Sequence, residues 1–417
     1  MKKHVLTMLI SSAFLLTACG SGDGGDSTYV VDDGIPKNNI VNPVVRVESY
    51  TDIDSDVNTD LDAVSASKSL MTYKMLGVDG TEVDATTLVF TPKTVAPANG
   101  WPIVVWAHGT TGVADKCAPS ALGLGQTAEL IEELLDEGYV VVAPNYEGLG
   151  SAGNHPFLNL KSEAFSITDA VVAARKYLKG QLGKNVSDQW VSIGHSQGGH
   201  AVLGAAQYAS RAQLNYKGTV AIAPASNLAF ILTAGEVKAS TLPLAQQIPT
   251  LAQLDTYTAL IVAGMQGYKS SVTYNEVFKN DTALIAPIAE TECASDVADY
   301  LGGSMYAYAT DPQKGKGSLS GYGRTQSGFM TLPVINTFLQ TSSQPGLAKL
   351  NQKVFIYQGL ADTTVPYQAT DILVQSMKAN GTSASDIQYT TNAIWDHGTV
   401  YTQNYASFVG NIDSLLK

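Results

Sequence analysis

The sequence predicts an α/β fold with a mainly parallel central sheet, flanked by helices and carrying one inserted, mostly helical region. Short apolar runs alternate with stretches of helical spacing along most of the chain, which is typical of a parallel sheet covered by helices. Most of the runs are apolar at consecutive positions, as expected of strands buried on both faces. Between residues 227 and 346 this rhythm is absent, and the stretch is too long for an ordinary loop.

The individual elements follow from apolar runs and from the turns that bound them. Residues 69–92 predict two strands joined by a turn at residues 77–80. Further strands are predicted over residues 101–109, at the start of 139–150, and over 189–196, 218–226, 353–359 and 387–394. Helices are predicted over residues 128–138, with Gly138 as a C-cap, and over 166–178, 199–209, 368–381 and 401–416.

The N-terminus resembles a bacterial lipoprotein signal. Two lysines precede an apolar run over residues 5–16 that is too short to span a membrane. The following "LTAC" resembles a lipobox, so we expect residues 1–18 to be a cleaved signal peptide and Cys19 to carry lipid. The mature protein would be an exported, membrane-anchored lipoprotein, facing the periplasm or lying at the outer membrane or cell surface. The alternative is an ordinary signal peptide cut near Ala18.

The rest of the chain divides into a tether and one domain. Residues 19–40 begin with a Gly-, Asp- and Ser-rich stretch and predict a flexible tether. Residues 41–417 predict a single domain with a cap insertion at about 227–346. Only 15% of the 417 residues are charged, and the net charge is −12. An acidic chain without a basic cluster argues against nucleic-acid binding and favours a neutral or weakly polar ligand. Nothing in the sequence indicates an oligomeric state.

Beyond Cys19, the cysteines are Cys117 and Cys293. An even pair in an exported protein predicts a disulfide, and the alternative is two buried thiols. No spacing of Cys and His suggests a zinc site.

The sequence "GHSQG" (194–198) matches G-x-S-x-G between a predicted strand and a predicted helix. In this context the pattern is typical of a sharp turn that exposes the Oγ of its serine. The flanking glycines leave room where a Cβ would collide with neighbouring backbone, and the helix N-terminus stabilises negative charge. We therefore interpret Ser196 as a nucleophile. The alternative is a glycine-rich turn with a hydrogen-bonded serine.

A serine nucleophile needs a base, and the chain order expected here is serine, acid, histidine. Only His397 lies after Ser196 and outside the helix that begins there. It follows the last predicted strand, where a loop can bring an imidazole over the sheet. The alternative for a lone loop histidine is simple solvent exposure. The remaining histidines are His4, His108, His155, His195 and His200.

The acid is expected after a late strand, at the carboxyl end of the sheet. Asp362 lies three residues beyond the strand predicted over 353–359. Asp396 adjoins His397, and adjacent side chains on an extended chain point apart, whereas Asp371 falls in a predicted helix. We therefore predict Asp362 as the acid. Its alternative role is that of a turn or N-cap residue.

Negative charge on a reacting carbonyl oxygen needs two N–H donors. One is expected from Gln197, the residue after the nucleophile, and the other from the loop "HGTTG" (108–112), where Thr110 is the candidate. The Thr110 hydroxyl is a further possible donor. The alternative is an ordinary glycine-rich loop.

The segments "HGTTGVADKCAPS", "VVAPNYEGLG", "GHSQGG" and "GLADTTVPY" together resemble the secretory lipase family of lipase A-like α/β-hydrolases, from about Ser69 to the C-terminus. The resemblance implies Ser196, Asp362 and His397 as a catalytic triad, with the N–H groups of Thr110 and Gln197 as the oxyanion hole.

The resemblance also implies a helical cap between late strands and a Cys117–Cys293 disulfide that ties the cap to the oxyanion loop. One departure is Asn145, where the family has aspartate before "YEGLG".

Taken together, these residues predict an enzyme that cleaves carboxylic esters, of small molecules or lipids, through an acyl-serine intermediate. No metal or organic cofactor is expected. One alternative is a peptidase, polyester depolymerase or acyltransferase with the same triad, because fold and triad do not determine the acyl group or the acceptor. Another is a non-catalytic lipoprotein that uses this fold to bind at the cell surface.

Overall fold

A computed structural model describes residues 33–268 and 270–417 of the chain. The chain divides into two units, residues 1–35 and 36–417, and every element below belongs to the second. Its centre is a nine-stranded sheet with the order β1-β2-β3-β5-β4-β6-β7-β8-β9. The strands are β1 (Val44–Ser49), β2 (Ser65–Leu76), β3 (Glu82–Pro92), β4 (Trp101–Ala107), β5 (Val140–Pro144), β6 (Val186–His195), β7 (Asn215–Ile222), β8 (Lys353–Gly359) and β9 (Ile387–Asn392).

The sheet has an antiparallel edge and a parallel body. Strands β1, β2 and β3 pair antiparallel, and β3 pairs antiparallel with β5. From β5 through β4, β6, β7 and β8 to β9, all neighbours are parallel. The predicted mainly parallel α/β fold is therefore confirmed. All eight predicted strands are present, and β1 is an additional edge strand.

Helices cover both faces of the sheet. One apolar core lies between the sheet and α4, α5 and α12, and a second lies between the sheet and α1, α3, α13 and α14. These helices are α1 (Ser55–Val64), α3 (Thr127–Asp136), α4 (Leu160–Lys176), α5 (Gln197–Gln207), α12 (Tyr367–Ala379), α13 (Thr399–Thr402) and α14 (Tyr405–Leu416), and a short helix α2 (Pro119–Leu122) precedes α3.

Local chemistry explains where these helices begin and end. Gly138 ends α3 as predicted, because its φ of +85° lets Gly138 and Tyr139 donate back to the last turn. Helix α4 begins six residues before the predicted start, since Asn159 caps it by accepting from the Ser162 N–H. The helix predicted over 401–416 is two helices, because Asn404 leaves the helical conformation with φ −129° and ψ 16°.

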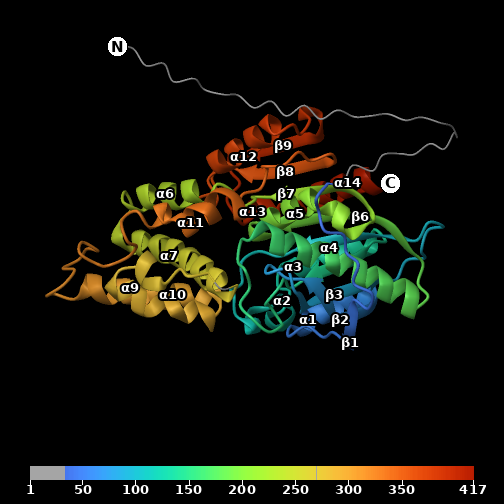
Figure 1. Ribbon diagram of the computed structural model, residues 1–417, viewed down its shortest axis with the longest axis horizontal. Coiled ribbons are helices and arrows are strands. Elements are labelled where there is room, and N and C mark those ends of the chain that lie inside the picture. Colours follow the sequence, from blue (N-terminus) through green and yellow to red (C-terminus); the bar gives the residue numbers. More distant parts are fainter. Residues whose placement is uncertain (1–32, 269) are drawn as a thin grey trace, which may run out of the picture. The chain divides into compact units, whose positions relative to one another are not determined.

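Between β7 and β8 the described residues form helices and connecting loops, and no strand of the sheet. We call residues 228–342 the helical segment. It has its own apolar core, in which α7 packs against α6 and α10, and Figure 1 shows α6, α7, α9 and α10 grouped together. The helices are α6 (Leu228–Ala239), α7 (Leu244–Gly267), α8 (Tyr274–Val277), α9 (Asn280–Ile285), α10 (Ala294–Thr310) and α11 (Pro333–Thr337), followed by a π-helical turn (Phe338–Ser342).

Candidate active site

Ser196 lies at the turn between β6 and α5, in a backbone conformation that side chains rarely adopt. Its φ is +60° and its ψ is −115°, a combination that costs free energy and is kept only where the surroundings impose it. The Ser196 N–H donates to the Ile222 carbonyl at 2.9 Å, and the Ser196 carbonyl accepts from the His200 and Ala225 N–H groups. Backbone contacts to β7 and α5 therefore hold the turn and its serine in place.

Two glycines make this turn possible. A Cβ on Gly194 would lie 2.4 Å from the Gly198 carbonyl oxygen, and a Cβ on Gly198 would lie 1.9 Å from the Ala107 carbonyl oxygen. Both contacts are with backbone, which cannot move aside cheaply. The glycines therefore allow β4, β6 and α5 to approach each other at the serine.

Asp362 and His397 meet at the same edge of the sheet. The His397 Nδ1 lies 2.7 Å from the Asp362 Oδ2. Asp362 follows β8 and its side chain is fully buried, whereas 21% of the His397 side chain is exposed. The Asp362 Oδ1 also accepts from the N–H groups of Thr364 and Val365. The carboxylate thus orders its own turn with one oxygen and contacts the imidazole with the other.

The loop that carries His397 is fixed next to the nucleophile turn. The Nε2 of His195, the residue before Ser196, donates to the His397 carbonyl at 2.8 Å, and the two imidazoles lie 4.6 Å apart. Burial lowers the pKa of His195 to about 3, so this ring stays neutral. None of the described residues bonds to the Nε2 of His397. That nitrogen is therefore available to a reacting group.

The rival acids point elsewhere. The Asp396 carboxylate accepts from the Gly398 and Thr399 N–H groups and from the Thr399 hydroxyl. These hydrogen bonds lower the pKa of Asp396 and give it a turn-forming role. Asp371 lies within α12, as the sequence predicts.

The loop after β4 places Thr110 beside Ser196, and both residues line the same pocket. The loop is attached to the helical segment at two adjacent points. The Ala294 N–H donates to the Thr111 carbonyl at 2.9 Å, and Gly112 forms an isolated β-bridge with Cys293. Cys293 is also joined to Cys117 by a disulfide, the pairing that the family resemblance implies.

Residues that follow β5 support the loop that carries Thr110. The His108 ring stacks on Tyr146 with centroids 4.2 Å apart, and burial lowers the pKa of His108 to about 4. Asn145 donates from Nδ2 to the hydroxyls of Thr86 and Ser120. At this position the amide therefore acts as a donor between two hydroxyl groups, which an aspartate could not do.

A buried polar cluster under the nucleophile turn was not predicted from the sequence. It contains His155, Glu163, Gln197 and His200, each at most 1% exposed. The Glu163 Oε2 lies 2.5 Å from the His200 Nδ1, and the Gln197 Nε2 lies 2.8 Å from the Glu163 Oε1. The only signal in the sequence is that His200 follows Ser196 by one helical turn; no local pattern points to Glu163.

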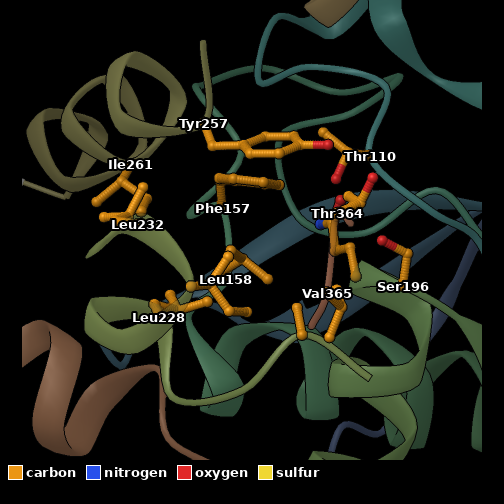
Figure 2. Close-up of a pocket in the computed structure, with 13 residues that line it drawn as sticks. Thr110, Phe157, Leu158, Ser196, Leu228, Leu232, Tyr257, Ile261, Thr364 and Val365 are labelled. Carbon is orange, nitrogen blue, oxygen red and sulfur yellow. The ribbon is translucent and has the colours of Figure 1, made fainter. Parts of the chain in front are cut away.

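An apolar pocket opens at Ser196. Besides Ser196, Gln197 and Thr110, its walls come from the loops near residues 157 and 364 and from α6 and α7. Figure 2 shows the Tyr257 ring over the pocket, with its hydroxyl directed towards Thr110. The remaining lining residues are Phe157, Leu158, Ala225, Leu228, Ile231, Leu232, Ile261, Thr364 and Val365.

The structure describes little of the predicted N-terminal region. Cys19, the signal peptide over 1–18 and most of the tether over 19–40 lie outside the described residues. Asn38, in the predicted tether, is buried and donates to Asp169 at 2.9 Å. Within residues 33–268 and 270–417 no helix is both long and apolar enough to cross a membrane. In those ranges no three His, Cys, Asp or Glu side chains are placed to hold a metal ion.

Comparison with known proteins adds a family and a set of similar folds. A sequence profile described as "Secretory lipase" matches residues 118–407. The fold is similar to that of lipase A from Candida antarctica in its closed state, with a TM-score of 0.67, 17% identity, and coverage of 92% of this chain and 83% of that one. It is also similar to the rice cell wall degrading esterase LipA from Xanthomonas oryzae, with a TM-score of 0.63, 19% identity, and coverage of 90% and 98%. No curated protein sequence matches the chain.

Proposed function

Because the chain belongs to the secretory lipase family and is a carboxylic ester hydrolase, we propose that it cleaves its substrate through an acyl-serine intermediate on Ser196. The observation that carries this proposal is the 2.7 Å contact between His397 and Asp362 beside the strained serine. A nucleophile, a base and an acid at one edge of a sheet form the arrangement that activates a hydroxyl group.

The first step transfers a proton and forms a bond. Asp362 accepts from the Nδ1–H of His397, which leaves the Nε2 unprotonated and able to accept the Ser196 proton. The Ser196 Oγ then attacks the ester carbonyl carbon, and the carbonyl π electrons move onto its oxygen. The buried Asp362 carboxylate stabilises the imidazolium that results.

The negative charge on the former carbonyl oxygen needs donors. We assign them to the N–H groups of Gln197 and Thr110. The Gln197 N–H is at the first position of α5, where helix geometry leaves an N–H without an intrahelical partner. The α5 N-terminus also favours negative charge. Each such donor is worth roughly 10²- to 10³-fold in kcat.

The remaining steps release the alcohol and the acid. The imidazolium gives its proton to the alkoxy oxygen, the carbon–oxygen ester bond breaks, and the acyl group remains on the Ser196 Oγ. A water molecule then loses a proton to His397 and attacks the acyl carbon. Collapse of this second intermediate returns the proton to Ser196 and frees the carboxylic acid.

The pocket supports an ester with an apolar acyl group. Most of its walls are hydrocarbon, and those of Leu228, Ile231 and Leu232 come from α6. An acyl chain that leaves water for such walls gains roughly 0.8 kcal/mol per buried CH₂. We therefore propose that the acyl chain lies against α6 and α7, with the helical segment acting as a cap that selects its length.

We also propose that the protein is exported and held at a membrane by lipid on Cys19. The lipobox-like "LTAC" and the family's description as secretory support this proposal. Cells fed a palmitate analogue should label the wild type and leave Cys19→Ala unlabelled. Equal labelling of the two would contradict the anchor.

The mechanism is tested with nitrophenyl esters from acetate to palmitate, together with a triglyceride emulsion. Ser196→Ala should lose nearly all turnover of every ester that the wild type cleaves. Ser226→Ala is the control, because Ser226 is a buried serine whose hydroxyl donates to the Ala369 carbonyl and accepts from the Asn227 Nδ2. Substantial turnover in Ser196→Ala would contradict the mechanism. The chain length of the best ester reports what the pocket admits.

A further inference from the structure

Glu163 is a buried carboxylate that the steps above do not use. It lies on α4, its side chain is fully buried, and its two oxygens contact different partners. The Oε1 accepts from the Gln197 Nε2 at 2.8 Å and from the Leu158 N–H at 3.1 Å. The Oε2 lies 2.5 Å from the His200 Nδ1. A buried carboxylate without such partners would be strongly destabilising, so these contacts stabilise its burial.

The hydrogen-bond partners of His200 and Glu163 indicate which atoms carry hydrogen. The His200 Nε2 lies 3.0 Å from the Ser343 carbonyl oxygen, which can only accept, so the Nε2 carries a hydrogen. Burial would raise the pKa of Glu163, but the charge of His200 and the contacts with His155 and His200 lower that pKa to about 2. Both imidazole nitrogens of His200 thus face oxygen atoms, the Nδ1 that of the Glu163 carboxylate and the Nε2 that of the Ser343 carbonyl.

The Gln197 side chain is oriented by the same cluster. The His155 Nδ1 donates to the Glu147 carbonyl at 2.9 Å, so its Nε2 accepts from the Gln197 Nε2 at 2.8 Å. Both amide hydrogens of Gln197 are thus engaged, one by His155 and one by Glu163. The Gln197 Oε1 is buried and has no partner among the described residues. The hydrogen bonds that orient the Gln197 side chain within the described residues are therefore those of its NH₂ group.

We propose that Glu163 is a positioning residue for the oxyanion hole. It holds the Gln197 side chain, and through it the orientation of the Gln197 N–H. The inference rests on the acyl-serine mechanism proposed above. It extends to the helical segment, because His200 joins Glu163 to Ser343, directly after the π-helical turn that ends this segment. One carboxylate thus connects the nucleophile turn to the point where the helical segment returns to the sheet.

Glu163→Leu should lower kcat by about 10- to 100-fold and change KM by less than about threefold, because a donor displaced by roughly 1 Å fails mainly in the transition state. Glu163→Gln should restore kcat to within about threefold of the wild type. Its amide can accept from Gln197 and donate to a neutral His200, so every hydrogen bond is kept.

A double-mutant cycle tests the route through Gln197. Gln197→Met removes the amide and keeps a side chain of similar length, and it should lower kcat about as much as Glu163→Leu. In the Gln197→Met background, Glu163→Leu should lower kcat by less than about threefold more. The matched control is Asp169→Asn, because Asp169 is equally buried and pairs with Arg211 away from the pocket. It should lower the melting temperature and leave kcat unchanged.

Wild-type kcat in folded Glu163→Leu would overturn the inference, and so would an undiminished kcat loss in the Gln197→Met background. If Glu163→Leu does not fold, Gln197→Met alone decides, because wild-type kcat in that variant would also overturn it. A fluorophosphonate probe separates this inference from the mechanism. Labelling of Ser196 in every Glu163 variant, with wild-type kcat, would refute only the role of Glu163, whereas absence of labelling in the wild type would refute the acyl-serine mechanism.

Discussion

Two carboxylate–histidine pairs contact the turn that carries Ser196, and they differ in what the second nitrogen of each imidazole can do. In the Asp362–His397 pair the ring is partly exposed, and none of the described residues bonds to its Nε2. In the Glu163–His200 pair both side chains are fully buried, and the His200 Nε2 contacts the Ser343 carbonyl. The same two functional groups can therefore act as a base in one place and as a support in another.

The carboxylates of the two pairs do not account for their different roles. Both acids are buried, and both accept additional N–H groups from their surroundings. What differs is the freedom of the imidazole to exchange a proton with a substrate. Substitutions at the two pairs should accordingly separate chemistry from positioning and stability.

The largest effect is expected at His397. His397→Ala should lower kcat/KM by at least about 10³-fold while the protein remains folded, because Ser196 loses its base. His200→Ala should mainly lower the melting temperature, with a kcat loss of no more than about 100-fold. Steady-state kinetics and thermal unfolding of the two variants decide the matter. Equal losses of kcat/KM in His397→Ala and His200→Ala would contradict the different roles of the two pairs.

The acid of the first pair is tested by a matched exchange. Asp362→Asn should lower kcat by roughly 10²- to 10⁴-fold, since an amide favours the wrong imidazole tautomer and cannot stabilise imidazolium. Asp396→Asn should change kcat by less than about threefold, because the hydrogen bonds of that carboxylate within the described part of the chain come from Gly398 and Thr399. The assignment of the acid is wrong if the larger loss occurs at Asp396.

A smaller effect is expected from the Cys117–Cys293 disulfide, which covalently joins the region after β4 to the helical segment. Changing both Cys117 and Cys293 to serine should lower the free energy of unfolding by about 2–5 kcal/mol. Turnover should fall less than about tenfold, because the Ala294 N–H still holds the Thr111 carbonyl. Urea unfolding and kcat of the double variant give both values. An unchanged free energy of unfolding would speak against a stabilising link.

The smallest effect is expected at His195, the residue before the nucleophile. It concerns how the free energy of unfolding depends on pH. Burial lowers the pKa of His195 to about 3, whereas an unfolded histidine titrates near pH 6.5. Between these values the unfolded chain binds a proton that the folded protein does not, so the free energy of unfolding falls as the pH is lowered. His195→Gln should make this fall shallower between pH 6.5 and 4.5. Parallel curves for wild type and variant would show that His195 does not contribute.

The sequence predicted the parallel sheet well because its strands are buried on both faces and therefore largely apolar, as in β5 and in residues 354–357 of β8. It missed β1, an edge strand with no buried residue, and α1, in which only Leu61 is buried. Those elements form because neighbours pair with them or cover them, and such neighbours leave little periodic signal in the local sequence.

The candidate site divides in the same way. Ser196, Asp362 and His397 could be proposed because each lies where a predicted strand ends, and chain order left few choices. Glu163 could not be proposed, since it contacts His200 only after α4 packs on α5. The additional turn-ordering role of Asp362 was foreseen as its alternative, and one carboxylate can serve both functions because it has two oxygens.

The most direct test of the acyl-serine mechanism is to trap the acyl enzyme. The wild type is mixed with a nitrophenyl ester, quenched in acid within milliseconds, digested and examined by mass spectrometry. The mechanism predicts one added acyl group on the peptide that contains Ser196, with a burst of nitrophenol of about one equivalent per enzyme. Turnover without any acyl adduct, or an adduct on a different residue, would contradict it.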